Sequence, residues 1–347
     1  MDEYITQQYK DEIDRIPEVL KQTLDAFLKN DMPYFGNLHL KKRRLKKIKT
    51  IIIAGQADEY NTSKSAAFNL ELLTGINCFA LNLSELCSTR VVLNSSVMVI
   101  ILSQNGESPI ASTVALRVKQ QNALAVAVTQ NAESELAQLC KSKIIADCFD
   151  SICRFCKEYL ILALFGIYIG YRTKNLPRLT VSVTSKIAQM LSGSTVLSNR
   201  SKHELSGAIE VINRYSGIVV CGYGADEGVA NEVASALRKI CSKRAFSLEL
   251  CQADGSLNAL GDILLIAIVS NNADLEIINH RLSLLRQSGI DTLIFTTESI
   301  SGELCIDDGI VTVSDSIALF NPVTLASSVY QTAVLDAQND TKNDLSA

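Results

Sequence analysis

The chain has 347 residues, of which 47% are hydrophobic and 20% charged, and it carries a formal net charge of −4 at pH 7. This length is sufficient for two domains with sizeable cores, and the composition excludes a disordered or a fibrous chain. A negative net charge provides no long-range attraction to nucleic acid or to a membrane of anionic lipid, so neither is expected as a partner.

The N-terminus and the apolar stretches indicate where the protein works. Residues 1–5 begin acidic and lack the basic and apolar regions of a secretory signal. The longest apolar stretch, residues 160–170, is about half as long as a membrane-spanning helix and predicts a buried helix instead. The 10 Cys residues lie mostly inside apolar runs, which suits a reducing compartment. We therefore expect a cytoplasmic protein.

Residues 1–45 are predicted to form an N-terminal helical segment. Apolar side chains recur there at a three-to-four spacing from Ile13 to Phe27, and Pro17 either breaks or starts a helix. The basic run at 41–49 has two interpretations, a patch for phosphate or nucleic acid and a solvated turn before a strand. The second is favoured, because the rest of the chain is acidic.

Apolar runs alternate with helical patterns from residue 46 onward. The predicted strands cover 49–54, 76–81, 96–102 and 123–129, and the predicted helices cover about 60–74 and 109–121. Strands that are apolar on both faces and are separated by helices predict a parallel sheet that helices cover on each side. The first domain is therefore expected at 46–195.

The same order of elements then returns. The predicted strands cover 216–224 with its turn, 245–250, 262–270 and 291–297, and the predicted helices cover 226–240 and 273–288. We interpret the repeat as an internal duplication, with a second domain at 196–336 and a helical stretch at 151–210 joining the halves. The polar residues 337–347 are expected to form a loose tail. The expected fold class is α/β, with two three-layer α/β/α domains, each a mostly parallel sheet flanked by helices.

The connection after the third strand has the chemistry of an anion site. The strand ends at Ser103 and a helix begins at Pro109, so free N–H groups and the positive end of the helix dipole face the connection. Ser103, Asn105 and Ser108 add side-chain donors, and Gly106 lets a ligand approach the backbone closely. Open parallel sheets also bind ligands at the carboxyl ends of their strands. The alternative is an ordinary helix start with Ser108 as its cap.

Residues 103–108, Ser-Gln-Asn-Gly-Glu-Ser, resemble the Ser-Gln-Ser-Gly-Glu-Thr loop of sugar isomerase (SIS) domains. The likeness is to the tandem pair of SIS domains in the isomerase half of glucosamine-6-phosphate synthase and in related phosphosugar deglycases and deaminases. Three further segments agree in order: 12–17 is similar to Glu-Ile-x-x-Gln-Pro, 131–137 to Asn-x-x-Ser-x-Leu-Ala, and 221–224 to the Gly-x-Gly that opens the second domain. The resemblance covers nearly the whole chain.

The resemblance implies a function for this connection. By it, Ser103, Gln104, Asn105, Gly106 and Ser108 would bind the phosphate group of a hexose phosphate or a hexosamine phosphate. It also implies an SIS-like domain in each half of the chain. A homodimer with its sites near the subunit interface is expected on the same ground.

Two segments depart from the family at positions that bind ligand. The family opens with Gly-Thr-Ser, whereas this chain has Gly55, Gln56 and Ala57, so the Ser hydroxyl is missing. Residues 150–157 replace the family's Glu-x-x-Val-Ala-Ser-Thr-Lys, and the final Lys157 matches. Gly55, Gln56 and Lys157 therefore stay possible substrate-binding residues.

Asp150 and Arg154 are the charged substitutions in the second of these segments. Asp150 can stand for the family's Glu. Arg154 can pair with the phosphate, but an exposed surface Arg is the favoured interpretation.

The catalytic positions of the family depart further. The family's Leu-Lys-Glu-Ile supplies the carboxylate that moves a proton between sugar carbons, and this chain has Lys239 there. A Lys acts as a base only where it is strongly desolvated, so a solvated helix Lys is favoured. The family's Glu-Leu-Lys-His-Gly-Pro, whose His opens the sugar ring, corresponds to 249–254, where no His stands. Glu249 stays a possible substrate-binding residue.

Three other patterns were weighed for metal or nucleotide chemistry. Cys153 and Cys156 lack the second pair that structural zinc needs and are expected to be buried helix residues. Gly222 and Gly224 are not followed by the third Gly of a dinucleotide site. The three His residues lie far apart in sequence. No metal and no cofactor are therefore expected.

Two functions remain open at this point. The first is an enzyme that acts on a phosphorylated sugar, as an isomerase, deaminase or deglycase with atypical catalytic residues. The second is a non-catalytic sugar-phosphate-binding protein with a regulatory or partner role. The phosphate-binding residues expected at 103–108 support both functions. The absent Glu and His disfavour an ordinary isomerase, whereas the prevalence of enzymes in the family favours the first function, which we prefer.

Overall fold

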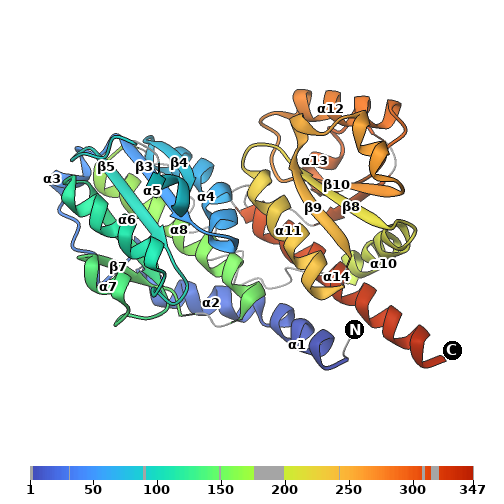
Figure 1. The fold of residues 1–347 in the computed structure, drawn as a ribbon, viewed down its shortest axis with the longest axis horizontal. Helices are drawn as coiled ribbons and strands as arrows, with labels where there is room; N and C mark the ends of the chain where they lie inside the picture. Colours follow the sequence, from blue (N-terminus) through green and yellow to red (C-terminus); the bar gives the residue numbers. More distant parts are fainter. Residues whose placement is uncertain are drawn as a thin grey trace. The chain divides into compact units, whose positions relative to one another are not determined.

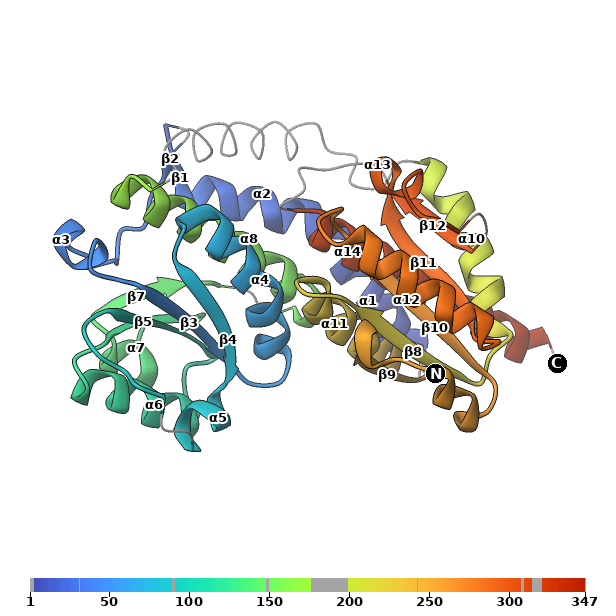
Figure 2. The same cartoon turned by 90° about the horizontal axis from the view of Figure 1, so that it is seen from above.

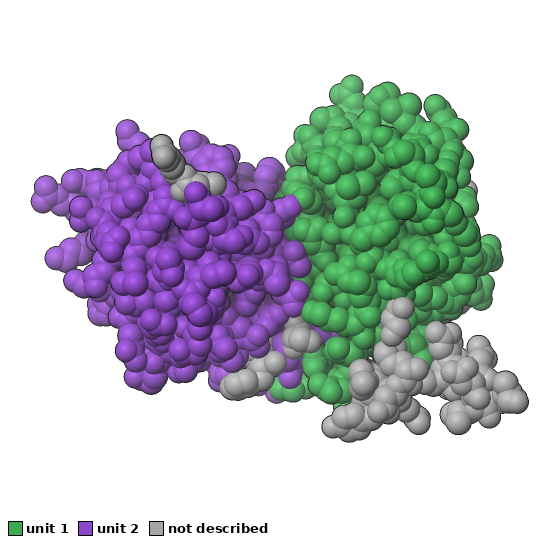
Figure 3. All heavy atoms as spheres, in the orientation of Figure 1, with its two compact units in different colours: residues 1–17, 193–347 green, residues 18–192 purple. Residues whose placement is uncertain are grey.

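The computed structural model of the chain describes eight stretches, which are residues 3–30, 32–88, 91–147, 150–175, 199–241, 243–306, 309–313 and 320–346. They form two compact units (Figure 3): unit 1 comprises residues 1–17 and 193–347, and unit 2 comprises residues 18–192. The domain boundary expected at 195–196 lies outside the described residues. Among the described helices, none combines the length and the apolar character that crossing a bilayer requires.

Unit 2 contains a five-stranded sheet in which all neighbouring strands are parallel. The strand order is β4-β3-β5-β6-β7, with β3 (Thr50–Gly55), β4 (Asn77–Asn82), β5 (Val97–Leu102), β6 (Leu124–Thr129) and β7 (Ser142–Ile145). The central strand β5 is buried over its whole length, as its continuous apolar sequence predicts.

Helices cover both faces of this sheet (Figure 1, Figure 2). One face carries α4 (Asp58–Thr74) and α8 (Ser151–Thr173), which pack against each other, and the other face carries α5 (Leu83–Ser88), α6 (Pro109–Gln120) and α7 (Glu135–Leu139). Side chains of β3 alternate between the two faces, and Ile52 and Ala54 join the core cluster formed with α5, α6 and α7. Unit 2 is therefore a three-layer α/β/α structure.

Unit 1 contains a second parallel five-stranded sheet. The strand order is β12-β11-β10-β8-β9, with β8 (Gly217–Gly222), β9 (Arg244–Glu249), β10 (Ile263–Val269), β11 (Asp291–Thr297) and β12 (Ile310–Val313). Counted from the first strand of each sheet, the two sheets have the same order. The edge strands β4 and β9 even carry an exposed Phe at the same position, Phe79 and Phe246.

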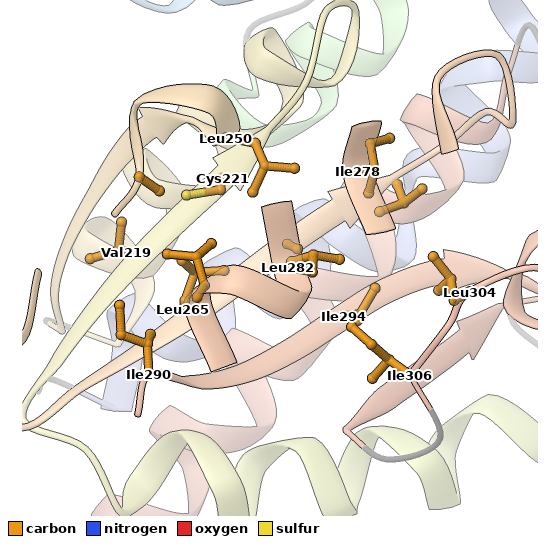
Figure 4. Close-up of a cluster of buried hydrophobic side chains, with 14 of the residues drawn as sticks. Val219, Cys221, Leu250, Leu265, Ile278, Leu282, Ile290, Ile294, Leu304 and Ile306 are labelled. Carbon is orange, nitrogen blue, oxygen red and sulfur yellow. The ribbon is translucent and has the colours of Figure 1, made fainter. Parts of the chain in front are cut away.

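The helices of unit 1 enclose two sides of its sheet. A core cluster (Figure 4) joins β8 and β10 to α12 (Leu275–Gln287) and α13 (Glu298–Ser301). Helix α11 (Asp226–Ile240) packs against α14 (Asn321–Ser346), which also contacts α10 (Asn199–Asn213) and α1 (Glu3–Asp14). The short 3-10 helices η1 (Leu250–Gln252) and η2 (Gly255–Leu260) follow β9. The expected fold class, two parallel-sheet α/β domains flanked by helices, is confirmed.

The N-terminal segment is helical as expected, but its three described helices do not belong to one unit. Helix α1 lies in unit 1. Unit 2 contains α2 (Ile16–Phe27) from Glu18 onward, the small hairpin of β1 (Leu28–Lys29) and β2 (Met32–Pro33), and α3 (Lys42–Leu45). The basic run forms α3 and the turn before β3, and its Lys and Arg side chains are exposed. This agrees with the solvated interpretation.

The C-terminal expectation is wrong. Residues 337–346 were expected to form a loose tail, and they are the last turns of α14. The sequence after Pro322 contains neither Gly nor Pro, so nothing in it stops a helix that the buried residues up to Ala337 have started. Polarity alone was a poor sign of disorder here.

Candidate functional site

The connection from β5 to α6 begins and ends where the sequence predicts. Ser103 follows β5 and is held by its backbone N–H, which donates to the Val128 carbonyl at 3.0 Å. The side chains of Gln104 and Ser108 are half-buried, and those of Asn105 and Glu107 are exposed. We call residues 103–108 the β5–α6 loop. Ser103 itself is buried, at 6% exposure, so the accessible polar side chains of the loop are those of residues 104, 105, 107 and 108.

Gly106 packs closely against the connection from β6 to α7 of the same unit. Its φ is +73°, and a Cβ at this position would lie 2.1 Å from the Ser134 Oγ and 2.8 Å from the Thr129 Oγ1. The Gly106 carbonyl accepts the Leu136 N–H at 3.0 Å. The sequence suggested that Gly106 serves close approach of a ligand, whereas the structure shows a close approach of the protein's own Ser134.

Ser108 caps helix α6, as the alternative interpretation proposed. Its Oγ accepts the Ala111 N–H at 3.5 Å, and Pro109 occupies the first helical position. Accepting this bond leaves the hydroxyl hydrogen available as a donor. The cap and an anion contact are therefore compatible.

The first turn of α4 provides two carboxylates near the loop. The Glu59 Oε1 accepts the Gln104 backbone N–H at 3.2 Å, and the Asp58 Oδ2 lies 2.9 Å from a guanidinium nitrogen of Arg154. Arg154 comes from the first turn of α8, and its other terminal nitrogen donates to the Gln104 side-chain oxygen. These four residues join α4, α8 and the β5–α6 loop through hydrogen bonds.

Arg154 corrects one expectation from the sequence. It was expected to be an exposed surface residue, but it is 8% exposed and is held between Asp58 and Gln104. One helical turn further, the same two helices are joined by a bond from the Thr62 hydroxyl to the Glu158 carboxylate at 3.4 Å. Polar side chains at this spacing on α8 therefore face α4 rather than solvent.

The arrangement leaves several donors for an anion. Because Arg154 binds the amide oxygen of Gln104, the Gln104 NH₂ group is the free end of that side chain. Within the part of the chain that the structure describes, neither the Ser103 hydroxyl nor the Asn105 N–H makes a hydrogen bond. The carboxylate of Glu59 is an opposing charge, since it holds the Gln104 N–H.

The β3–α4 connection lies beside the loop, because β3 and β5 are neighbours and Glu59 bonds Gln104. A Cβ on Gly55 would lie 2.5 Å from the Glu59 carbonyl, so only Gly lets α4 start this close to the strand. Gln56 is exposed. Ala57 has φ +52° and ψ −120°, a conformation that costs a non-Gly residue on the order of 1–3 kcal/mol.

The remaining predicted residues lie further from the loop. Lys157 is half-buried on α8, and its Nζ donates to the Asp147 carbonyl. Asp150 precedes α8 and makes no side-chain cap bond. Glu249 ends β9 in unit 1 and is no part of the cluster built within unit 2. Lys239 is exposed on α11, as expected of a helix Lys.

Sequence reasoning missed a buried carboxyl group at the carboxyl edge of the unit 1 sheet. Asp226, the first residue of α11, is 0% exposed, and burial raises its pKa to about 7 although hydrogen bonds from Ser270 lower it. The Ser270 N–H donates to Asp226 at 2.9 Å, and the Ser270 hydroxyl donates to its other oxygen. The sequence showed only an acid at a helix start, which is common on the surface.

Sequence comparisons with known proteins match part of the chain. The sequence model described as SIS domain matches residues 44–153, which include the β5–α6 loop. A glutamine–fructose-6-phosphate aminotransferase (isomerizing) from Wigglesworthia glossinidia brevipalpis is 29% identical over 129 residues, which are 37% of this chain and 21% of that protein. The chain thus spans about a fifth of the length of this curated relative.

Solved structures share the fold over nearly the whole chain. The C-terminal domain of glucosamine-fructose-6-phosphate aminotransferase from Francisella tularensis superposes with a TM-score of 0.82 at 18% identity, covering 95% of this chain and 96% of that one. Tagatose-6-phosphate ketose/aldose isomerase from Escherichia coli gives 0.65 at 16% identity, covering 95% and 93%. At these identities the likeness shows the fold alone.

Proposed function

We propose that unit 2 binds the phosphate group of a hexose phosphate or a hexosamine phosphate at the β5–α6 loop. The observation that carries the proposal is the set of donors at the carboxyl edge of a parallel sheet, next to the start of the 12-residue helix α6. The Ser103 hydroxyl, the Gln104 NH₂ group and the Asn105 N–H are its donors, with the Ser108 hydroxyl at the cap. The match to the SIS domain over residues 44–153 supports the same assignment.

Arg154 compensates for two features that disfavour an anion. The hydroxyl expected after Gly55 is replaced by Ala57, and Glu59 adds a negative charge at the Gln104 N–H. The Arg154 guanidinium places a buried positive charge one hydrogen bond from the loop and orients the Gln104 amide. A phosphate bound by Gln104 would therefore be stabilised by the positive charge of Arg154, which is bonded to the other end of the same amide.

We further infer chemistry of the isomerase, deaminase or deglycase class, carried out by residues other than the usual Glu and His. A second candidate, binding without turnover, is favoured by one observation. Lys239 stands at the position of the family's proton-transferring Glu and is exposed on α11, so no carboxylate is present at that position. Turnover assays on any ligand that binds separate the two candidates.

The assembly and location are proposals as well. We propose that the chain works in the cytoplasm and forms a homodimer. The dimer is supported by exposed apolar side chains on α4 and on the edge strand β4, which suit burial against a second copy. Phe68 and Leu72 lie one turn apart on α4, and Phe79 lies on β4; they are 48%, 55% and 53% exposed. Light scattering of the purified chain tests the dimer, and a monomeric mass would contradict it.

The binding proposal is tested by thermal unfolding with fructose-6-phosphate, glucosamine-6-phosphate and the two unphosphorylated sugars. Stabilisation is expected with the phosphorylated sugars only, and it grows with the ratio of ligand concentration to dissociation constant. The double variant Ser103→Ala, Ser108→Ala is expected to lose this response. Equal responses to phosphorylated and unphosphorylated sugars would contradict the proposal.

A further inference from the structure

We propose that unit 1 cannot take a phosphate at the edge that corresponds to the β5–α6 loop, because Asp226 fills that position with the protein's own carboxyl group. The chain would therefore bind one phosphosugar, in unit 2. This inference rests on the proposed function of unit 2. It makes Asp226 the residue that decides which of two equivalent edges is open to ligand.

The correspondence follows from the shared strand order. β10 occupies in unit 1 the place that β5 occupies in unit 2, and Ser270 follows β10 as Ser103 follows β5. Helix α11 follows β8 as α4 follows β3, so Asp226 corresponds to Asp58, each being the first residue of its helix.

The contacts of the two Ser residues differ. In unit 1 the Ser270 hydroxyl and N–H both donate to Asp226, which is fully buried. In unit 2 the Ser103 N–H donates to the Val128 carbonyl, so the Ser hydroxyl is the donor that both edges share. The Asp226 oxygen that accepts the Ser270 hydroxyl thus stands where a phosphate oxygen bound to the Ser103 hydroxyl would stand in unit 2.

A difference in charge between the first turns of α8 and α14 accounts for the different contacts. In unit 2, Arg154 in the first turn of α8 binds Asp58 and draws it away from Ser103. In unit 1 the first residue of α14 is the neutral Asn321, whose side chain donates to the Ser270 carbonyl at 2.9 Å. Asn321 carries no charge, and Asp226 binds Ser270 instead.

The helices that follow the two Ser residues, α6 and α12, also differ in charge, and again unit 1 has the more negative residue. Ser108 is the N-cap of α6, and Asp274 is the N-cap of α12. Asp274 places an acidic residue at the start of α12, whereas Ser108 offers a hydroxyl at the start of α6. Both acids therefore close the edge of unit 1 to a phosphate.

The test uses variants in a background that blocks unit 2. Ser108→Asp keeps a helix-capping side chain and adds a negative charge, so this single variant is expected to lose the phosphate response. Adding Asp226→Ala with Asp274→Ser is expected to create a new rise of Tm with inorganic phosphate, measured against sodium chloride at equal ionic strength. Adding Asp226→Asn with Asp274→Ser leaves the position filled and is expected to give no rise.

Titration calorimetry of the wild-type chain with glucosamine-6-phosphate is the second measurement, and it holds even if the Asp226→Ala variant fails to fold. One equivalent per chain that disappears with Ser108→Asp supports the inference. Two equivalents, or one that survives Ser108→Asp, would overturn it. A folded Asp226→Ala, Asp274→Ser variant without a phosphate response would also overturn it. If the wild type binds no phosphosugar at all, the function proposed for unit 2 fails, while the phosphate response of the unit 1 variants still decides this inference.

Discussion

The Arg154 guanidinium bridges the Asp58 carboxylate, at 2.9 Å, and the side-chain oxygen of Gln104 in the loop proposed to bind phosphate. The side chain of Arg154 is 10% exposed and that of Asp58 is 27% exposed, so the pair is largely shielded from solvent. A charge pair of this kind both fixes an amide and keeps an acid away from the anion. Substitutions can separate the two effects, orienting the Gln104 amide and holding the Asp58 carboxylate away from the anion.

Replacing Arg154 tests both effects. Arg154→Met is expected to weaken phosphosugar binding about tenfold or more and to destabilise the chain by about 2 kcal/mol, since it leaves Asp58 partly buried without its cation. The double variant Arg154→Met, Asp58→Asn is expected to regain most of the stability but not the affinity. Urea unfolding and titration calorimetry measure the two quantities. Recovery of affinity in the double variant would show that Arg154 serves stability alone.

Gly106 is expected to tolerate no side chain. Gly106→Ala places a Cβ 2.1 Å from the Ser134 Oγ in a backbone conformation with φ +73°, so a loss of about 3 kcal/mol or more is expected. Gly224→Ala is the matched control, because Gly224 has φ +58° with open space around it and should lose only about 1 kcal/mol. Equal losses for the two variants in urea unfolding would contradict the packing argument.

Ala57 and Ala225 precede α4 and α11, the helices that follow the first strand of each five-stranded sheet, in different backbone conformations. Ala57 has φ +52° and ψ −120°, whereas Ala225 has φ −61° and ψ −28°. Ala57→Gly is therefore expected to stabilise the chain by about 1 kcal/mol, and Ala225→Gly to destabilise it by a similar amount. Chemical unfolding of both variants checks the opposite signs. A destabilising Ala57→Gly would mean that the strain is absent.

Asp226 is expected to make stability depend on pH. Burial raises the pKa of this carboxyl to about 7 in the folded chain, well above its value in the unfolded chain, so the folded state binds the extra proton. Its contribution is therefore present in full only below the unfolded pKa of about 4 and is lost progressively as pH rises from there to about 7. Relative to Asp226→Asn, the wild type should lose on the order of a few kcal/mol over this range. A difference between the two proteins that is constant with pH would contradict the assignment.

The strands and the site were predictable to different extents. Long apolar strands such as β5 and β10 were located to within one residue, because their sequences are apolar throughout. The four-residue strands β7 and β12 were missed; the pattern of β7, Ser-Lys-Ile-Ile, shows too little periodicity to separate it from a loop.

The contacts between distant residues were beyond the sequence. The β5–α6 loop was located because its residues are contiguous. Arg154 lies 50 residues from Gln104 and 96 from Asp58 along the chain, and Asp226 lies 44 from Ser270. Nothing local marks such pairs, so a buried Arg was taken for a surface residue and the buried Asp226 was not recognised as a candidate site residue.

The most direct measurement of the central claim is the dissociation constant for glucosamine-6-phosphate in three proteins, by titration calorimetry. The wild type is compared with Ser108→Asp, which adds a negative charge at the start of α6, and with Gln121→Asp, which adds the same charge just beyond the other end of that helix. The account predicts that Ser108→Asp weakens binding at least about a hundredfold while Gln121→Asp changes it by less than about threefold. Equal affinities in all three proteins would contradict it.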